Sequence, residues 1–363
     1  MFYATGYQCE WYQAQSPRQW PAASCTAIRV DDDRVIHFDT EREAALGRVF
    51  SCADDTRFFP RTDLRDGSAF VVDELAREGW LRGAVGLELW SYRPNRMLSQ
   101  RFQGLLEAAG AHVVDGTDVL REVRWVKSEA EMACLTEAAR IADIGLEAAA
   151  GAIAPGVTEL EVYGEVVQAM AGAGGEDPAI TMPVLSGSKT NAAHALSTRR
   201  TIGQGEVVTV DVCGVVNRYH ANAARTFHTG EPPADLAAVA AAAAASIDAV
   251  RALLRPGLPV RELNETLLSY YHEHALWEAR GWIGGYEMGI GFPSDWVGNF
   301  VYDPLSEKNA DRVFEPNTAV NHEIQIFMPR HVGQFFVIES FLFEKDKVTL
   351  ATPEIPYTLN VVG

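Results

Sequence analysis

Cysteine is scarce in this sequence, which has five cysteines among 363 residues. Their number is odd and no two form a C-x-x-C pair, so neither a disulfide framework nor a cysteine-rich zinc site is expected. We expect reduced thiols and a cytoplasmic protein. Cys213 lies two residues after Asp211, but no helix start or basic neighbour there would lower its pKa, which favours a buried structural thiol over a nucleophile.

Positive charge and long apolar runs are also lacking. The 31 Lys and Arg residues face 49 Asp and Glu, giving a net charge of −18, which argues against nucleic acid or an anionic membrane as the main partner. No stretch reaches the roughly 18 apolar residues of a membrane span. The Ala-rich stretch after Pro233 comes closest, but Asp235, Asp248 and Arg251 indicate a soluble helix. The start, MFYATGYQCEWYQ, lacks the pattern of a signal peptide.

Hydrophobic residues make up 47% of the chain, enough for a sizeable core. In the first block, residues 1–122, CTAIRV and RVIHFDT predict a hairpin around DDD. AFVVDELAREGW predicts a helix, and GAVGLEL and AHVVDG predict strands that follow glycine turns. This alternation is typical of an α/β domain.

The second block, residues 123–363, begins with two helix signals. Ser128 with Glu131 and Thr158 with Glu161 have the spacing of capping boxes. The segments AITMPVLSG, GEVVTVDVCGVV and YHANAARTFHTG then predict strands, and residues 235–254 and 260–280 predict helices. The last quarter indicates loops and antiparallel strands, so this block is predicted to be α+β.

The stretch VDVCGVVNRYHANAART contains Asp211 and, eleven residues later, Asn222. FYATGY, VRWVKSEAEM and PVLSGSKTNAAHA precede it in the chain. In this order the motifs resemble the M24 "pita-bread" family, which includes methionine aminopeptidase, aminopeptidase P, prolidase and creatinase. The resemblance covers nearly the whole chain. It implies a creatinase-like N-terminal domain over 1–122 and a pita-bread catalytic domain over 123–363, with His194 as the family's active-site histidine.

The metal-dependent members of that family use two Asp, one His and two Glu around two divalent ions. By resemblance, Asp211 matches the first Asp, Asn222 replaces the second and Tyr286 replaces the His, while Glu323 and Glu339 match the two Glu. An amide oxygen is a poor ligand, and a phenol with a pKa of about 10 rarely binds a divalent ion unaided. A dinuclear metal site is therefore not expected.

Asp211, Glu323 and Glu339 are expected to place three carboxylates around one pocket. Like charges at such distances need a cation or raised pKa values. One retained metal ion, a cationic substrate or a protonated carboxyl would each meet this need. NRYHANAART and GIGFPSDW resemble the branch with creatinase, which uses this fold without metal, and ectoine hydrolase.

Each candidate residue also has a structural interpretation. His194 could be a core histidine, and the two Glu could be solvated strand charges, although FFVIESFLF surrounds Glu339 with apolar residues. Asn222 and Tyr286 are either hydrogen-bond donors to substrate or relics. Strand alternation puts His220 on the Asn222 face. By resemblance to creatinase-like dimers, an N-terminal loop reaches the partner's active site, or it is only a surface loop; its candidates for substrate recognition are Glu10, Trp11, Tyr12 and Arg18.

We predict a homodimeric, creatinase-like hydrolase that needs no metal and cleaves a C–N bond in a small cationic compound derived from an amino acid, such as a guanidino, amidine or amide compound. His194 is expected to shuttle the proton, with Glu339 and Glu323 on the cationic group and Asp211 in support. The alternatives are an Xaa-Pro peptidase with one divalent ion on the three carboxylates, a lyase acting on a small zwitterion, and a non-catalytic binding protein.

Overall fold

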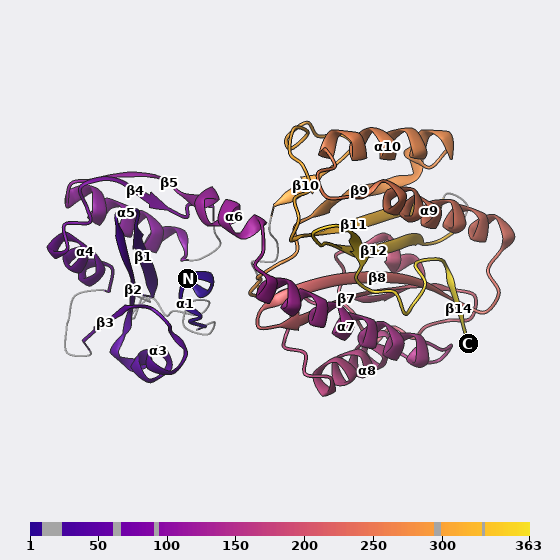
Figure 1. Cartoon of the computed structure of the whole chain (residues 1–363). Coiled ribbons are helices and arrows are strands. Elements are labelled where there is room, and N and C mark those ends of the chain that lie inside the picture. Colours follow the sequence, from indigo (N-terminus) through magenta and orange to yellow (C-terminus); the bar gives the residue numbers. More distant parts are fainter. Residues whose placement is uncertain (9–23, 61–66, 91–93, 294–298, 329–330) are drawn as a thin grey trace. The chain divides into compact units, whose positions relative to one another are not determined.

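The computed structural model describes residues 1–8, 24–60, 67–90, 94–293, 299–328 and 331–363. Within them the chain divides into two compact units, Met1–Leu120 and Arg121–Gly363 (Figure 1). Each unit has its own sheet structure and its own buried apolar core. The candidate site residues that lie on strands all belong to the second unit.

The first unit combines short strands with helices and is an α/β structure, as predicted. β1 (Cys25–Arg29) and β2 (Asp32–Thr40) form the expected antiparallel hairpin, and β3 (Asp55–Phe59) pairs parallel with β2. β4 (Gly83–Leu87) and β5 (Ala111–Asp115) form a separate parallel pair. The helices described in this part of the chain are α1 (Phe2–Thr5), η1 (Glu41–Glu43), α3 (Ala44–Phe50), α4 (Gly67–Arg77) and α5 (Arg96–Ala108). α6 (Thr117–Trp125) crosses the boundary between the two units.

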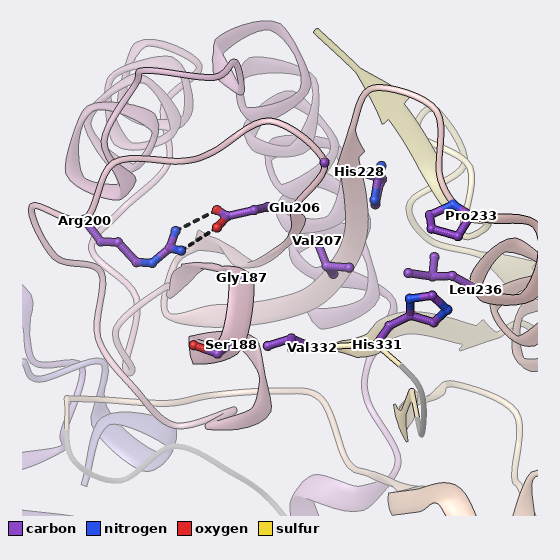
Figure 2. A pocket seen from close by; sticks show the side chains of 11 residues that line it. Gly187, Ser188, Arg200, Glu206, Val207, His228, Pro233, Leu236, His331 and Val332 are labelled. Atoms are coloured by element: carbon purple, nitrogen blue, oxygen red, sulfur yellow. Dashed lines mark hydrogen bonds and ion pairs between the residues drawn. The ribbon is translucent and has the colours of Figure 1, made fainter.

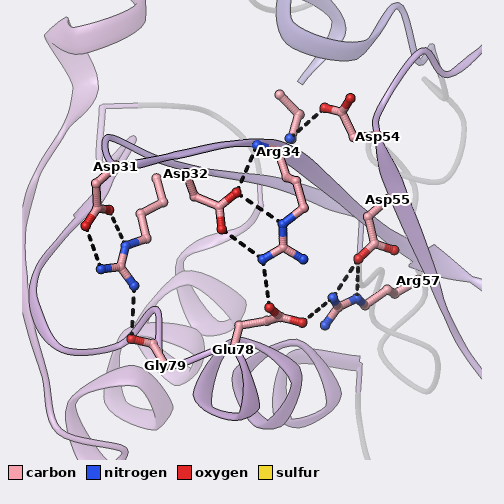
Figure 3. Close-up of polar contacts among 10 residues, drawn as sticks. Asp31, Asp32, Arg34, Asp54, Asp55, Arg57, Glu78 and Gly79 are labelled. Carbon is pink, nitrogen blue, oxygen red and sulfur yellow. Dashed lines mark hydrogen bonds and ion pairs between the residues drawn. The ribbon is translucent and has the colours of Figure 1, made fainter.

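Ion pairs link the strands of the first unit to the end of α4 (Figure 3). Arg34 on β2 lies 2.8 Å from Asp32 and 2.9 Å from Glu78. Arg57 on β3 lies 2.6 Å from Asp55 and 2.5 Å from the same Glu78. Because these side chains are partly exposed, water screens the charges and each pair contributes little to stability. The apolar cluster between the strands and α4 and α5 is therefore the main source of this unit's stability.

The second unit is built on a sheet of nine strands. Its main path runs β10-β9-β11-β12-β8-β7-β6, with β13 beside β12 and β14 beside β8. The described pairings are antiparallel except that between β14 and β8. The strands are β6 (Val184–Ser186), β7 (Val207–Val216), β8 (Tyr219–Thr229), β9 (Arg280–Tyr286), β10 (Phe300–Tyr302), β11 (Thr318–Phe327), β12 (Gln334–Phe343), β13 (Val348–Leu350) and β14 (Asn360–Val362).

Two capping boxes start the first helices of this unit, as predicted. For α7 (Glu129–Ala152), the Glu131 N–H donates to Ser128 Oγ at 3.3 Å, and the Ser128 N–H donates to the Glu131 carboxylate at 2.7 Å. Thr158 and Glu161 make the same pair of bonds at the start of α8 (Glu159–Gly172). Each box satisfies two N–H groups that a helix start leaves unpaired, which fixes where the helix begins.

The second pair of helices is α9 (Ala234–Leu253) and α10 (Val260–Glu273). α10 is shorter than the predicted 260–280, because Ala275 adopts a left-handed conformation with φ 55° and ends the helical path. A short helix, η3 (Trp277–Ala279), leads into β9 instead. Among the described helices, α9 is long and apolar enough to cross a bilayer. In this fold its Leu236, Ala240 and Ile247 are buried in the core.

The helices α7, α8, α9 and α10 pack on one face of the sheet. Ala223 and Phe227 of β8 are buried in the cluster formed with α7 and α8, and Val337 of β12 is buried with α9 and α10. Ala224 of β8 directly opposes Ile338 of β12, so their odd-numbered neighbours project to the same side. The even-numbered residues of β8 and β12 therefore project to the face opposite the helices.

Candidate active site

A row of directly opposed residues brings two acids to one face of the sheet. Asp211 on β7 opposes Ala224 on β8, and Ala224 opposes Ile338 on β12. Ile338 in turn opposes Glu323 on β11. Opposed residues of an antiparallel pair project to the same side. Asp211 and Glu323 therefore share the face opposite the helices, with the apolar side chains of Ala224 and Ile338 in the row between them.

Asn222 and Tyr286 connect the two acids by hydrogen bonds. Asn222 Nδ2 donates to Asp211 Oδ1 at 2.7 Å and to the Val212 carbonyl at 3.0 Å. The Tyr286 hydroxyl has one proton to donate, and its two acceptors are Asn222 Oδ1, at 3.0 Å, and the Glu323 carboxylate. The Val212 carbonyl can only accept hydrogen bonds, so the Asn222 atom next to it must be the amide nitrogen. This same nitrogen also faces Asp211. Asn222 and Tyr286 thus form a row of polar contacts between Asp211 and Glu323.

Both acids hold their protons more tightly than usual. Burial raises the pKa of Asp211 to about 8; the charge of Glu323 adds to the rise, and the Asn222 hydrogen bond opposes it. Burial also raises the pKa of Glu323 to about 7, against the hydrogen bonds of Tyr286 and of Gln325, whose Nε2 lies 2.6 Å from Glu323 Oε1. The pair therefore carries less than its full charge near neutral pH, and a bound cation would lower both pKa values.

Glu339 lies on the other face of the sheet. It follows Ile338 on β12 and therefore projects to the side of the helices, away from Asp211 and Glu323. This corrects the expectation that three carboxylates surround one pocket. The residue of β12 that faces the two acids is Ile338, so the described site contains two carboxylates with an apolar residue at the third position.

Glu339 instead belongs to a buried cluster that sequence reasoning did not find. Arg225 Nη2 lies 2.6 Å from Glu339 Oε2, and both side chains are fully buried. Thr352 Oγ1 donates to Glu339 Oε1 at 2.6 Å. Burial, followed by the charge of Glu339, raises the pKa of Asp143 on α7 to about 7. The signal in the sequence was Arg225 itself, since an arginine inside a buried strand requires an acidic partner.

The histidines near these strands are held by other contacts. His220 shares the Asn222 face by its register on β8. Its Nε2 accepts from the Ala179 N–H at 3.0 Å, and its Nδ1 is bonded to the Arg218 carbonyl at 2.7 Å. Burial lowers the pKa of His220 to about 3. Because both ring nitrogens are engaged, His220 has no ring nitrogen left to bind a substrate, contrary to the expectation from strand alternation.

His194 lies in a turn between β6 and β7 and is exposed. Within the described ranges it makes no hydrogen bond or ion pair. Its loop begins with η2 (Gly187–Asn191), beside a cavity of about 270 Å³ (Figure 2). Glu10, Trp11, Tyr12 and Arg18, the predicted recognition residues of the N-terminal loop, lie outside the described residues.

With this geometry in view, comparisons with known proteins identify the family. The model of metallopeptidase family M24 matches residues 133–344, more than half of the 363-residue chain. An uncharacterized hydrolase/peptidase, y4tL, of Sinorhizobium fredii is 31% identical over 198 residues, which are 53% of this chain and 50% of that protein. The ectoine hydrolase of Halomonas elongata is 24% identical over 271 residues, 70% of this chain and 67% of that enzyme.

Comparison with solved structures identifies the fold. The crystal structure of an X-Pro aminopeptidase from Thermotoga maritima superimposes with a TM-score of 0.78 at 17% identity, covering 99% of this chain and 93% of the other. The chain belongs to metallopeptidase family M24 and has the pita-bread fold. The match to the first of the curated relatives spans about half of that protein's length.

The residues of this site do not fit the pair of divalent ions used by metal-dependent members of the family. Asn222 directs its N–H groups, which repel cations, at Asp211 and at a carbonyl. Tyr286 supplies a hydroxyl whose pKa burial raises well above its usual value, so it stays neutral. Glu339 projects to the other face. Among the residues that the structure describes, no three His, Cys, Asp or Glu side chains gather in a way that could hold a metal ion.

Proposed function

We propose that this chain is a hydrolase that cleaves a C–N bond in a small cationic compound derived from an amino acid, without a resident metal ion. A guanidino, amidine or amide compound is the preferred substrate class. The observation that carries the proposal is the pair Asp211 and Glu323, which share one face and are joined through Asn222 and Tyr286 where metal donors would be required.

Charge favours a cationic ligand at this pair. Two partly buried carboxylates cannot both ionise at low cost unless a positive charge neutralises them. Membership of the M24 family supports hydrolysis, and the similarity to an ectoine hydrolase supports a small molecule over a protein as substrate. The apolar Ile338 and Ala224 between the acids add a surface for the uncharged part of such a molecule.

In the proposed reaction, the oxygen of a water molecule attacks the carbon of the C–N bond. His194 takes the proton from this water and delivers it to the leaving nitrogen, so the bond breaks without net loss or gain of protons at the enzyme. Glu323 and Asp211 hold the cationic group and orient the water. Glu339 takes no part in substrate binding, because Arg225 and Thr352 occupy its carboxylate.

The test combines metal analysis with turnover. Protein purified without chelators or a metal-binding tag should contain far less than one ion per chain by plasma mass spectrometry. A panel of guanidino, amidine and cyclic amide compounds should then contain a substrate whose hydrolysis resists EDTA. One tightly held ion per chain, or activity on Xaa-Pro dipeptides that requires added Mn²⁺, Co²⁺ or Zn²⁺, would replace this proposal with the peptidase alternative.

The role of His194 has its own test. Replacing His194 with Ala should lower kcat by at least about 100-fold, because general acid–base catalysis contributes about 10²–10⁴. The thermal unfolding midpoint should stay unchanged, since the side chain is exposed. Retention of most activity would remove His194 from the mechanism.

We further propose that the protein works in the cytoplasm as a homodimer. Cys25, Cys52, Cys134 and Cys213 are free thiols, which supports a reducing compartment. Light scattering coupled to size exclusion measures the oligomeric state directly. A monomeric mass at assay concentration would contradict the dimer.

A further inference from the structure

The segment that carries His194 is a loop whose two ends meet on α8. It leaves β6 after Ser186 and returns along α8, where the Leu160 N–H donates to the Thr198 carbonyl at 3.2 Å. Thr158 and Thr201 form an isolated β-bridge just beyond. Loops with closed ends and exposed tips are often functional.

One carboxylate binds both ends of this loop. Glu159, the first residue of α8, is fully buried. Its Oε1 accepts from the N–H and hydroxyl of Ser186, both at 2.9 Å. Its Oε2 accepts from Lys189 Nζ at 2.5 Å and from the N–H and hydroxyl of Thr198, both at 2.9 Å. Burial alone would raise the pKa of Glu159, but these hydrogen bonds keep it below its usual range.

Further contacts hold the two ends of the loop (Figure 2). Arg200 and Glu206 form a two-point ion pair at 2.6 and 2.8 Å, and Arg200 Nη1 donates to Ser186 Oγ at 2.6 Å. The Gln334 N–H at the start of β12 donates to Thr190 Oγ1 at 3.2 Å. The ends of the loop are therefore fixed to α8 and to the sheet, whereas the residues around His194 are largely exposed.

We propose that Glu159 is the positioning residue of His194. His194 itself has no polar contact within the described part of the chain, so its place depends on how firmly the ends of its loop are held. Glu159 contacts both ends through its two carboxylate oxygens. Displacement of a catalytic group by about 1 Å can cost about 100-fold in rate, so this anchor controls turnover from a distance. The inference rests on the proposed role of His194.

The experiment compares Glu159→Gln with Glu161→Gln in the full-length protein. Both changes remove one negative charge from the first turn of α8, but among the described residues the Glu161 carboxylate hydrogen-bonds to Thr158 of the helix cap and not to the loop. Hydrogen exchange of residues 187–199 is measured first, because it requires no substrate. Glu159→Gln should speed exchange in this segment by at least about tenfold while the core strands keep their protection, and Glu161→Gln should not.

Steady-state kinetics then separate positioning from mere stability. Glu159→Gln should lower kcat by about 10- to 100-fold with KM changed by less than about threefold. Because Glu159 acts through His194, adding Glu159→Gln to His194→Ala should cause no further loss of kcat. If Glu159→Gln does not fold, Thr198→Val is the second variant. It removes the hydroxyl bond to Glu159, together with the bonds that this hydroxyl accepts from Lys189 Nζ and the Arg200 N–H. The Thr198 N–H still contacts Glu159, so the same pattern is expected at smaller size.

Three results would overturn the inference, and they are distinguishable. Unchanged exchange in residues 187–199 would show that Glu159 is not the anchor. Faster exchange with unchanged kcat, while His194→Ala remains inactive, would show that the anchor does not position His194. An active His194→Ala variant would overturn the proposed mechanism, and the positioning role with it, whatever the exchange data show.

Discussion

A carboxylate at position 222 could only accept hydrogen bonds, whereas the Asn222 amide donates two and accepts one. The two donated bonds reach Asp211 and the Val212 carbonyl, and the accepted bond comes from Tyr286. This single side chain therefore supplies, by hydrogen bonding, the contact with Asp211 that a shared cation provides in a metal site. Asn222 and Tyr286 depend on each other, because each satisfies a polar atom of the other.

Replacing Tyr286 with Phe tests this dependence. The buried Asn222 Oδ1 would lose the bond that it now accepts at 3.0 Å, so the free energy of unfolding should fall by about 1–3 kcal/mol. Urea denaturation measures this difference. The control is Tyr163→Phe on α8, a partly buried tyrosine whose hydroxyl has no hydrogen bond within the described ranges; it should change stability by less than about 0.5 kcal/mol. Equal losses of stability in the two variants would contradict a stabilising hydrogen bond between Tyr286 and Asn222.

Binding of a cation to Asp211 and Glu323 should release protons. Their pKa values of about 8 and about 7 mean that both are partly protonated at pH 7, and a nearby positive charge lowers both values. Calorimetry with creatine as a guanidinium probe, in two buffers of different ionisation enthalpy, should show release of up to about one proton per chain. Asp211→Asn should reduce the release. Proton uptake on binding would contradict the raised pKa values of Asp211 and Glu323.

At the scale of elements, β7 and α7 approach so closely that a side chain between them is excluded. A Cβ atom at Gly214 would lie 1.8 Å from the Ala138 carbonyl oxygen. Gly214 and Asp211 are three residues apart on β7 and therefore project to opposite faces. The close contact with α7 thus holds the strand that presents Asp211.

Gly214→Ala should destabilise the protein by about 1–3 kcal/mol, because α7 and β7 must separate to admit the methyl group. The matched control is Gly164→Ala in the exposed interior of α8, where an added Cβ has no neighbour within 4 Å. This control should gain about 0.5–1 kcal/mol, since alanine favours the helix. Thermal unfolding of both variants checks the opposite signs. A neutral Gly214→Ala would show that α7 moves away freely.

Local patterns in the sequence predicted the helices and strands well. They did not predict the face to which each strand side chain projects, because that depends on how the strands pair. Ser128 and Thr158 marked the starts of α7 and α8 because a capping box lies within four residues. Glu339 was assigned to the wrong face because a shift of one residue on a strand reverses the side to which it projects. The sequence places Ile338 and Glu339 equally well opposite Glu323, and only the ladder decides between them.

At the scale of the whole molecule, several buried acids make stability depend on pH. Asp143, Asp211 and Glu323 have pKa values of about 7, 8 and 7 in the folded chain, above those of ordinary carboxyl groups. The folded state therefore binds more protons than the unfolded state between about pH 4 and pH 8. Their contribution to stability is complete below pH 4 and is lost as the pH rises through this range.

Asp143→Asn isolates one of these contributions away from the site. The wild-type protein should lose more stability than the variant between pH 5 and pH 7, by at most about 1.4 kcal/mol per pH unit, because the amide cannot ionise. Urea denaturation at four pH values measures the two slopes. Parallel slopes would show that Asp143 ionises as freely in the folded chain as in the unfolded one.

Long-range partners of the site were the hardest to predict. The spacing of Asp211 and Asn222 was visible because both lie on one hairpin, β7 and β8. Arg225 lies 114 residues from Glu339, and no local pattern joins them. The contact between Tyr286 and Asn222 spans 64 residues. The sequence therefore predicts the strand that carries Asp211 better than the side chains that surround it.

The apolar Ile338 between the two acids has a consequence for descent. Under the proposed metal-independent function, a set of metal donors on this face would require changes at Asn222, Tyr286 and Ile338, on three different strands. Asp at position 222 alone would put a second carboxylate next to Asp211, and Glu at 338 alone would bury a charge without a counter-ion. Each first step costs stability before any ion can bind. If the site works without a metal ion, as proposed, single substitutions at these three positions do not convert it into a metal site.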